Sequence, residues 1–311
     1  MKKILYIGDF KKLNGPSKVD VSLVENLNGE ITTFQSTSRD LLKLIKLLLE
    51  SKIIHVSGIS FIGFLAICLS KLFFKKSSYT MHGSLKFESK SKYVAKYRLF
   101  YEKAILLLVN RIFIVSKLMY CFIDNYSDKA VIIPNGYHPK THKKFQKEPN
   151  LIVAIGGGRI EKGVLELAQC VEEINNNYDF NCRLVVFGED GPTTDLIKTI
   201  DCVDYRGFRQ YEEVQNELLN ANIFASFSVF ESFSLAIVEA IESGCKVLTS
   251  ANVGVLDYVE LTSTIEVVYT NEDIKNSMIR LLTLNKTSVI SHKVPLWNEV
   301  ASLYLKEWEA V

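Results

Sequence analysis

Residues 227–250 read "FSVFESFSLAIVEAIESGCKVLTS" and indicate the fold class most clearly. The stretch begins at the end of one strand pattern, "ANIFASFS", and closes with a second, "CKVLTS". Between the two, Leu235, Val238 and Ile241 recur at helical spacing. Gly244 is then placed to end the helix. A buried strand, a crossover helix and another buried strand predict a parallel sheet covered by helices.

Two glutamates flank the start of this helix, Glu231 before it and Glu239 within it on an otherwise apolar helix. Ser232 or Ser234 can cap the helix. The N–H groups of residues 233–235 then lack partners inside the helix and favour an anion. A carboxylate accepts hydroxyl hydrogens well, as in the recognition of a ribose diol. A diphosphate beside two such carboxylates describes a nucleotide sugar.

The alternation of strand and helix runs through the rest of the chain. Six strand patterns precede residue 134: "KILYIGD", "ITTFQS", "KIIHVSG", "SSYTMHG", "RIFIVSK" and "AVIIPNG". Residues 134–150 interrupt the pattern with prolines, an Asn-Gly turn and lysines, as an interdomain linker does. The alternation then resumes with "NLIVAIGGG", "CRLVVFGE", "VDYRGF" and, near the end, "TIEVVY". We predict an α/β protein of two Rossmann-like, doubly wound domains, residues 1–144 and 145–311, facing an interdomain cleft.

Composition suits a folded protein in a reducing compartment. The 311 residues are 48% hydrophobic without a biased tract, so long disorder is not expected. The six cysteines form no Cys-x-x-Cys pair, which predicts buried, reduced thiols and a cytoplasmic location. The apolar run near Met1 is too short for a signal peptide. Residues 53–70 are uncharged and touch the length of a membrane span, but the polar His55 and Ser57 predict a strand followed by a packed helix.

Charge is divided unevenly along the chain. Residues 1–140 hold 22 Lys and Arg against 10 Asp and Glu, a net charge of +12, and the remainder carries −10. This asymmetry suggests an acidic or membrane-surface partner for the first half. Residues 75–103 mix Lys, Tyr and Phe, which suits either a solvated helix face or a peripheral contact with the inner face of the plasma membrane. No recognised module supports nucleic-acid binding.

A glycine-rich turn, "AIGGGRIEKGVLEL" (154–167), follows a strand and opens a helix. Its glycines allow backbone to approach a ligand, and Arg159 and Lys162 bring the two cations that a diphosphate site needs. A purely structural glycine turn is the alternative. The motif is not a Walker loop, because Val164 replaces the required Lys. It also fails the Rossmann fingerprint, since Glu161 occupies the last glycine position.

Together these segments resemble the retaining GT-B glycosyltransferases, and glycosyltransferase family 4 (group 1) in particular. The spacing Glu231-x7-Glu239 is similar to that family's Glu-x7-Glu signature, and "GGGRIEKGVLEL" to its Gly-Arg…Glu-Lys-Gly segment. "LVVFGEDGP" and "VDYRGF" resemble its Gly-x-Gly-Pro strand end and the Gly-Phe turn that follows. In the first half, "IIHVSG", "YTMHGS", "IFIVSK" and "VIIPNGY" resemble landmarks of its N-terminal domain. The resemblance covers most of the chain, in order.

The resemblance implies how the donor diphosphate would be held. Arg159 and Lys162 would neutralise its charge, with help from the N–H groups of Phe233, Ser234 and Leu235. No metal and no other cofactor is implied, and no Asp-x-Asp motif lies near the site. Cations and a helix start would then supply the leaving-group stabilisation that Mg²⁺ supplies elsewhere.

The resemblance also implies roles around the sugar and the base. Glu239 would hold the ribose and Glu231 the transferred sugar. The segment from Arg206 to Phe208 would lie beside the base, and His82 would reach the sugar from the first domain. A lone His at a strand end is otherwise often a satisfied polar residue, the interpretation that we keep for His55. Gly15 is the glycine of the loop that nears the donor phosphates, although family members often have two glycines there and this chain has Pro16 next.

The implied activity is that of a metal-independent hexosyltransferase-type glycosyltransferase. It would move a sugar from a UDP- or GDP-type donor to a glycan or lipid-linked oligosaccharide, with retention, in bacterial surface polysaccharide synthesis. One alternative is a catalytically silent GT-B partner or a glycan-binding component of a glycosyltransferase complex, in which loss of Glu231, Lys162 or Arg159 is expected. All three are present. A nucleotide-sugar epimerase needs further acid–base groups that we do not find.

The C-terminal tail, residues 294–311, has a helical apolar stripe at Leu296, Val300, Leu303 and Trp308. A last helix packed on its own domain is one interpretation. In the resembling family this segment crosses back to the first domain, and we predict the same crossing here, with the helix as part of the hinge.

Overall fold

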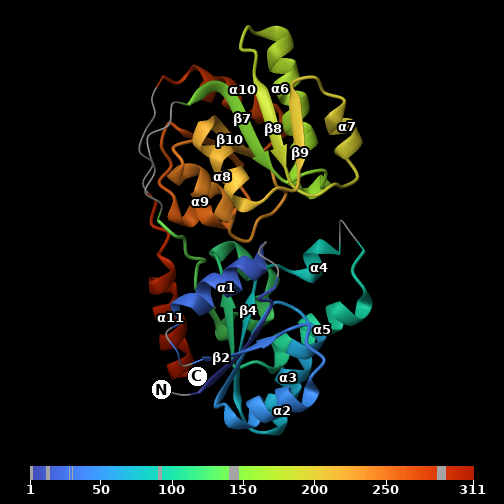
Figure 1. The fold of residues 1–311 in the computed structure, drawn as a ribbon, viewed down its shortest axis with the longest axis vertical. Coiled ribbons are helices and arrows are strands. Elements are labelled where there is room, and N and C mark those ends of the chain that lie inside the picture. The colour runs from blue at the N-terminus through green and yellow to red at the C-terminus, as the bar shows by residue number, and fades with distance from the viewer. Residues whose placement is uncertain are drawn as a thin grey trace. The chain divides into compact units, whose positions relative to one another are not determined.

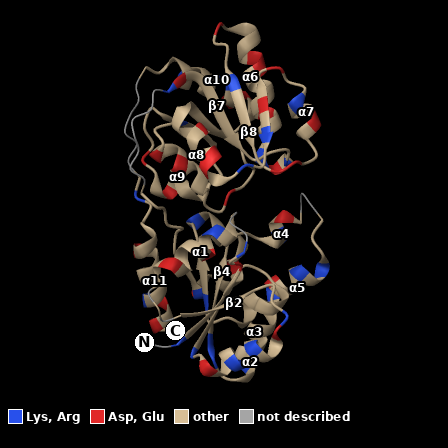
Figure 2. Cartoon of the chain, viewed as in Figure 1, with Lys and Arg blue, Asp and Glu red and all other residues tan. Residues whose placement is uncertain are grey.

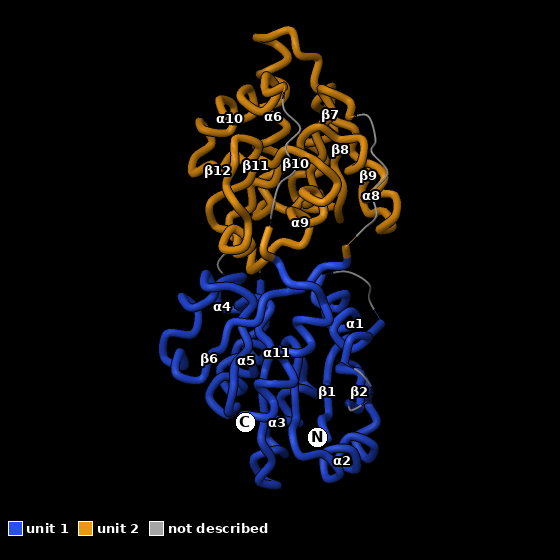
Figure 3. Tube along the Cα trace, turned by 90° about the vertical axis from the view of Figure 1, so that its left-hand side faces the viewer, with its two compact units in different colours: residues 1–138, 294–311 blue, residues 139–293 orange. Residues whose placement is uncertain are grey.

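The computed structural model describes residues 3–11, 15–27, 29, 31–89, 93–139, 147–285 and 292–311. The chain folds into two compact units (Figure 3). Unit 1 comprises residues 1–138 and 294–311, and unit 2 comprises residues 139–293. The domain boundary expected between residues 144 and 145 lies outside the described residues.

In the described part of unit 1, six parallel strands form one sheet (Figure 1). The strands are β1 (Ile4–Gly8), β2 (Ile31–Gln35), β3 (Ile53–Ser57), β4 (Lys76–Met81), β5 (Arg111–Ile114) and β6 (Ala130–Ile132). Their order is β2-β1-β3-β4-β5-β6. Every residue of β1 and β3 is buried, as expected of parallel strands that are covered on both faces.

Helices cover both faces of this sheet. They are α1 (Pro16–Asn26), α2 (Leu41–Glu50), α3 (Phe61–Leu72), α4 (Leu85–Glu88), α5 (Lys96–Leu108) and α11 (Trp297–Ala310), with the 3-10 helices η1 (Lys117–Phe122) and η2 (Asp124–Lys129). Neighbouring residues of β3 point to opposite faces. Val56 meets α3, because a Cβ added to Gly63 would lie 2.6 Å from Val56 Cγ1. His55 meets α11, with its ring centroid 5.2 Å from that of Trp308. The helices α3 and α11 therefore lie on opposite faces.

Unit 2 repeats the architecture. Its described strands are β7 (Glu148–Ile155), β8 (Arg183–Phe187), β9 (Val203–Gly207), β10 (Ala221–Ser226), β11 (Lys246–Ser250) and β12 (Ile265–Val268), and they pair in parallel in the order β12-β11-β10-β7-β8-β9. Residues 227–250 contain the helix that follows β10 and then β11, and β10 and β11 are neighbours in the sheet. The predicted pair of doubly wound sheets is confirmed.

Two sets of helices enclose the sheet of unit 2. They are α6 (Val164–Asn177), α7 (Thr194–Lys198), α8 (Tyr211–Asn220), α9 (Leu235–Glu242) and α10 (Asn271–Thr283), with the 3-10 helices η3 (Ile160–Lys162) and η4 (Gly254–Tyr258). Leu167 of α6 and Met278 of α10 share one buried cluster with alternate strand residues such as Ile152 and Leu184. The helices α8 and α9 contact each other.

The C-terminal segment belongs to unit 1. Trp308 is buried, and its Nε1–H donates to Ser78 Oγ at 3.0 Å. The Tyr304 hydroxyl lies 2.8 Å from Thr80 Oγ1. Both partners are in β4, so α11 fills the core of this unit, and its hinge role stays a prediction.

The uncharged run of residues 53–70 forms β3 and most of α3. Across the described residues, every helix falls short of the length and hydrophobicity that a membrane span demands. The predicted strand and packed helix are therefore what this run adopts.

Candidate functional site

The glycine turn of unit 2 lies between β7 and η3. Gly157 has φ 59°, and a Cβ on it would overlap the carbonyl oxygen of Glu189. A Cβ on Gly158 would overlap Thr194 Oγ1. Glu189 lies in the turn that follows β8, and Thr194 begins α7 directly after that turn. Close packing against this neighbouring segment therefore requires glycine at both positions, with or without a ligand. This agrees with the alternative that the glycine turn has a structural role.

The two cations of the turn behave differently. Arg159 is exposed, and its Nε–H donates to the Gly156 carbonyl at 3.3 Å. Lys162 forms an ion pair with Glu231, and the two side chains keep 15% and 22% of their exposure. Ser228 Oγ donates to the same Glu231 oxygen at 3.2 Å. The residues expected at the diphosphate and at the sugar are thus in contact with each other.

Backbone contacts bring these residues together. The Val229 N–H donates to the Glu161 carbonyl at 2.9 Å, which ties η3 to the loop before α9. The Glu231 N–H donates to the Asn252 carbonyl at 2.9 Å, and the Glu231 carbonyl accepts from Gly254 N–H at 3.0 Å. The loop that carries Glu231 is therefore fixed on both sides.

The start of α9 has an unusual backbone. Ser234 is at the N-cap position with φ 80° and ψ 82°, and its side chain makes no capping hydrogen bond. We expected Ser232 or Ser234 to cap this helix. Ser234 occupies the N-cap position but does not cap through its hydroxyl, because a capping side chain ordinarily requires an extended backbone at that residue. A left-handed backbone at a non-glycine residue stores strain and occurs often at functional sites. Phe233 is buried, and its carbonyl accepts from Val255 N–H at 2.9 Å. Leu235 is the first helical residue, and first-turn N–H groups lack partners inside a helix.

Glu239 lies on α9 beside α8. Gln215 Nε2 donates to Glu239 Oε2 at 3.0 Å. Tyr211, also on α8, has its pKa raised by burial, and the charge of Glu239 beside it raises the pKa further. The Glu239 carboxyl group is thus held in place by side chains of α8, and its oxygens are of the type that accepts hydrogen bonds from hydroxyls.

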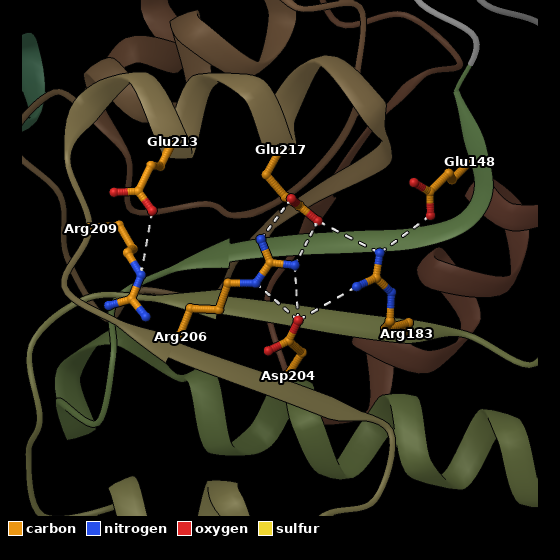
Figure 4. A network of polar contacts seen from close by, with 7 residues as sticks. All are labelled: Glu148, Arg183, Asp204, Arg206, Arg209, Glu213 and Glu217. Atoms are coloured by element: carbon orange, nitrogen blue, oxygen red, sulfur yellow. Dashed lines mark hydrogen bonds and ion pairs between the residues drawn. The ribbon is translucent and has the colours of Figure 1, made fainter.

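Arg206 lies within a network of charged side chains (Figure 4). Its guanidinium contacts Glu217 at 2.8 Å and Asp204 at 2.9 Å, and Arg183 reaches both carboxylates from the neighbouring strand. Sequence reasoning placed Arg206 beside the base, but its donors face these carboxylates. Phe208, at the end of the same turn, is 55% exposed.

In unit 1, His82 follows β4 and lies near the end of β3 and near a residue inside α1. Its Nε2 lies 2.7 Å from Ser57 Oγ, at the end of β3, and 3.9 Å from Asp20 Oδ1 on α1. Burial lowers the pKa of His82, and the charge of Asp20 acts in the opposite direction. Gly15 precedes α1 with φ 50° and ψ −127°, a conformation that suits glycine, and Pro16 begins the helix.

His55 is fully buried among the aromatic rings of unit 1. Its Nδ1 lies 2.9 Å from Ser78 Oγ and its Nε2 lies 3.1 Å from Thr80 Oγ1. Burial lowers its pKa to about 3, so the ring is neutral. Its surroundings match the structural role expected of it. Among the described residues, no three His, Cys, Asp or Glu side chains gather as a metal site requires.

Comparison with known proteins assigns unit 2. Residues 139–291 match the family model of the group 1 glycosyl transferases. Unit 2 is a group 1 glycosyl transferase domain. The chain is also similar to one component of the phosphatidylinositol N-acetylglucosaminyltransferase of Homo sapiens, with 26% identity over an alignment of 130 residues that covers 38% of this chain. This match spans about a quarter (26%) of that relative's length.

Solved glycosyltransferase structures share the whole fold. HepE from Anabaena, in complex with UDP and glucose, matches with a TM-score of 0.77 and 12% identity over 100% of both chains. Sucrose-phosphate synthase from Thermosynechococcus elongatus matches with a TM-score of 0.73 and 14% identity, again over 100% of both chains. The lipopolysaccharide outer core galactosyltransferase WaaB matches with a TM-score of 0.67 and 16% identity over 98% of both. The architecture is therefore GT-B.

Sequence reasoning missed several residues that surround the expected ones. Ser228 and Gln215 contact the two glutamates of unit 2, and Asp20 and Ser57 surround His82. Ser57 ends β3 and His82 follows β4, so the order of neighbouring strands would have brought them together. The position of Asp20 inside α1 carries no comparable signal.

Proposed function

We propose that the protein transfers a sugar from a nucleoside diphosphate sugar to a glycan or lipid-linked acceptor, with retention at the anomeric carbon. The contact of Lys162 with Glu231 beside the start of α9, within a group 1 glycosyl transferase domain, carries this proposal. The proposal is supported because a cation suited to phosphate, a carboxylate suited to hydroxyls and the start of a helix occur together in unit 2.

Each residue takes a role in donor binding. Arg159 and Lys162 hold the diphosphate, with N–H groups from Phe233 to Leu235. Glu231 holds the transferred sugar and Glu239 holds the ribose. Phe208 offers an exposed ring on which the base can stack. Arg206 stabilises the turn that carries Phe208 through its ion pair with Glu217.

The leaving diphosphate is stabilised by these cations and by the helix start, without a metal. Charge that develops on the leaving oxygen meets groups that are already in position, which lowers the barrier more than mobile water can. The sugar is a hexose in this proposal. UDP is the first nucleotide to test, because HepE structures contain UDP, UDP-glucose, or UDP and glucose.

The acceptor belongs to bacterial surface polysaccharide synthesis in this proposal. The name of WaaB, a lipopolysaccharide outer core galactosyltransferase, supports an acceptor of that class. An acceptor carried on lipid requires the enzyme to work at a membrane surface.

The apolar and basic exterior of unit 1 supports such a membrane contact. On α2, Leu42 is 82% exposed and Leu49 is 48% exposed, with Lys43 and Lys46 between them. Lys and Arg colour much of α2 and the start of α5 in Figure 2. Side chains of this kind insert into a headgroup layer while the lysines attract anionic lipid. Sedimentation with anionic phosphatidylglycerol vesicles should be lost in a Leu42→Ser, Leu49→Ser variant and weak with phosphatidylcholine.

Calorimetry with UDP, GDP and ADP, alone and as sugar conjugates, tests the donor. We expect one nucleotide series to bind, and absence of binding by all of them to folded protein would contradict the proposal. Transfer to an acceptor should then give a product whose anomeric proton shows the same configuration as the donor. Inversion of that configuration would contradict the retaining mechanism.

A catalytically silent partner is the second candidate. It would bind a nucleotide sugar without turning it over, even with an acceptor extract and any neighbouring transferase supplied. The presence of Arg159, Lys162 and Glu231 together favours the enzyme.

A further inference from the structure

A chain of three polar side chains connects α1 with the ends of two strands in unit 1. Asp20 of α1 accepts from Ser57 Oγ at 2.5 Å, and Ser57 Oγ lies 2.7 Å from His82 Nε2. Asp20 and His82 keep only 3% and 10% of their side-chain exposure. Because water is largely excluded, the hydrogen bonds among Asp20, Ser57 and His82 decide where the protons of these side chains lie.

The charge state of Asp20 follows from its donors. Its Oδ1 accepts from the Tyr6 hydroxyl at 2.7 Å as well as from Ser57, and its Oδ2 accepts from the Asp9 N–H at 3.0 Å. Three donors favour the carboxylate, although burial of the group raises its pKa. An ionised Asp20 can only accept.

The direction of the remaining hydrogen bond is then determined. Ser57 has a single hydroxyl hydrogen, and Asp20 takes it. The Ser57 oxygen must therefore accept from His82, so His82 carries its proton on Nε2. Its other nitrogen, Nδ1, keeps a lone pair and has no hydrogen-bond partner within the described part of the chain.

We propose that Asp20 and Ser57 are positioning residues that hold His82 as its Nε2–H tautomer, so that Nδ1 accepts a hydrogen bond from a hydroxyl of the transferred sugar. This inference rests on the proposed function for the contact with sugar, whereas the tautomer is a property of the free protein. It distinguishes His82, which follows β4, from the buried His55 of β3. His55 has both of its nitrogens next to hydroxyls of the fold, while His82 has one left for a ligand.

The tautomer is measured directly by ¹⁵N NMR of the imidazole in the full-length protein at pH 8, with His82 assigned through a His82→Gln variant. We expect the Nε2–H pattern in the wild type and a shift toward a mixture of tautomers in Ser57→Ala. An Nδ1–H pattern in the wild type would overturn the proposal. Asp20 would then be protonated and donate to Ser57, and Ser57 would donate to His82 Nε2.

Kinetics separate positioning from a general structural effect. Ser57→Ala and Asp20→Asn should lower kcat by about 10- to 100-fold, the usual cost of losing an orienting partner, with a nearly unchanged KM for the donor. Ser57→Thr, which keeps the hydroxyl, should restore most of the activity. Ser78→Ala is the matched control, because Ser78 is also buried, also lies in this sheet and contacts His55.

The outcomes are distinguishable. An equal loss of kcat in Ser78→Ala, or no loss in folded Ser57→Ala, would overturn the positioning role. If the wild type transfers no sugar from any donor, the proposed function fails. The NMR measurement still decides which tautomer of His82 is held by Ser57 and Asp20.

Discussion

Lys162 Nζ forms an ion pair with Glu231 Oε1, although 69 positions separate the two residues in sequence. In the absence of ligand each group therefore neutralises the other. In the proposed donor complex the phosphate contacts Lys162 and the sugar hydroxyls contact Glu231, so an intact nucleotide sugar would replace both partners. A bare nucleoside diphosphate replaces only one of them and leaves Glu231 with Ser228. The pair thus favours the complete donor over the spent nucleotide.

Substitution of Glu231 should consequently affect the two ligands in opposite directions. In Glu231→Gln, UDP should bind roughly two- to fivefold more tightly than in the wild type, because a partly exposed ion pair is worth up to about 1 kcal/mol. The UDP-sugar should bind more weakly, and transfer should be lost. Calorimetry with both ligands measures the two effects. Lys162→Met is the control and should weaken both ligands, and equal losses for both in Glu231→Gln would contradict the assigned roles.

Glu239 provides a second prediction, on the ribose. If it accepts hydrogen bonds from the ribose hydroxyls, Glu239→Ala should lose about 1–3 kcal/mol of UDP affinity, the range for hydrogen bonds to a charged group. The wild type should also discriminate against 2′- and 3′-deoxy-UDP, and the variant should not. Glu213→Ala removes a carboxylate of α8 that pairs with Arg209 and serves as the control. Undiminished discrimination in Glu239→Ala would show that the ribose is held elsewhere.

Arg206 and Phe208 should separate stability from binding. Arg206→Ala breaks the contacts with Glu217 and Asp204, so it should lower the midpoint of thermal unfolding while UDP affinity changes little (Figure 4). Phe208→Ala should lower UDP affinity while the midpoint of thermal unfolding changes little, because the Phe208 ring is exposed and can stack on a base. A calorimetric titration and a melting curve of each variant give both quantities. Loss of UDP affinity in Arg206→Ala without loss of stability would indicate that Arg206 contacts the base.

The fold could be predicted from the sequence because buried parallel strands read as short apolar runs. The pattern "KIIHVSG" predicted β3, and "CKVLTS" predicted β11, to within a residue or two. The order of the strands was beyond such patterns, since it depends on which strands meet in space. The left-handed backbone of Ser234 was also hidden, because serine ordinarily caps a helix through its side chain in an extended conformation.

The expected site residues were recognised by type, but their partners were not. Spacing identified Lys162 and Glu231 separately, and only the packing of η3 against the loop before α9 brings them into contact. The resemblance to the family placed Arg206 beside the base, and that position stays a prediction. Its contact with Glu217 was not foreseen, because Glu217 lies on α8, a different element. Charge pairing between elements is a property of the fold, and a linear pattern does not contain it.

Buried His55 should make the protein sensitive to acid. Its pKa is about 3 in the folded state against 6.5 ordinarily, so the unfolded chain binds a proton that the folded chain refuses between these values. The free energy of unfolding should therefore fall as pH drops below 6.5, by up to about 1.4 kcal/mol per pH unit from this group. Above 6.5 its contribution is constant. Urea unfolding at several pH values should show a shallower dependence of stability on pH in His55→Gln than in the wild type. Parallel curves for the two proteins would contradict this assignment.

Removal of residues 294–311 should abolish transfer while sparing nucleotide binding. These residues belong to unit 1, where Trp308 and Tyr304 of α11 hydrogen-bond to Ser78 and Thr80 of β4. Their loss exposes the face of the sheet that α11 covers, and removal of a single buried aromatic side chain already costs about 3–5 kcal/mol. Unit 2 has its own core, so it should still bind UDP. The milder Trp308→Ala variant should lower the unfolding temperature and reduce transfer, with UDP affinity nearly unchanged by calorimetry. Loss of UDP binding in Trp308→Ala would show instead that unit 2 depends on this helix.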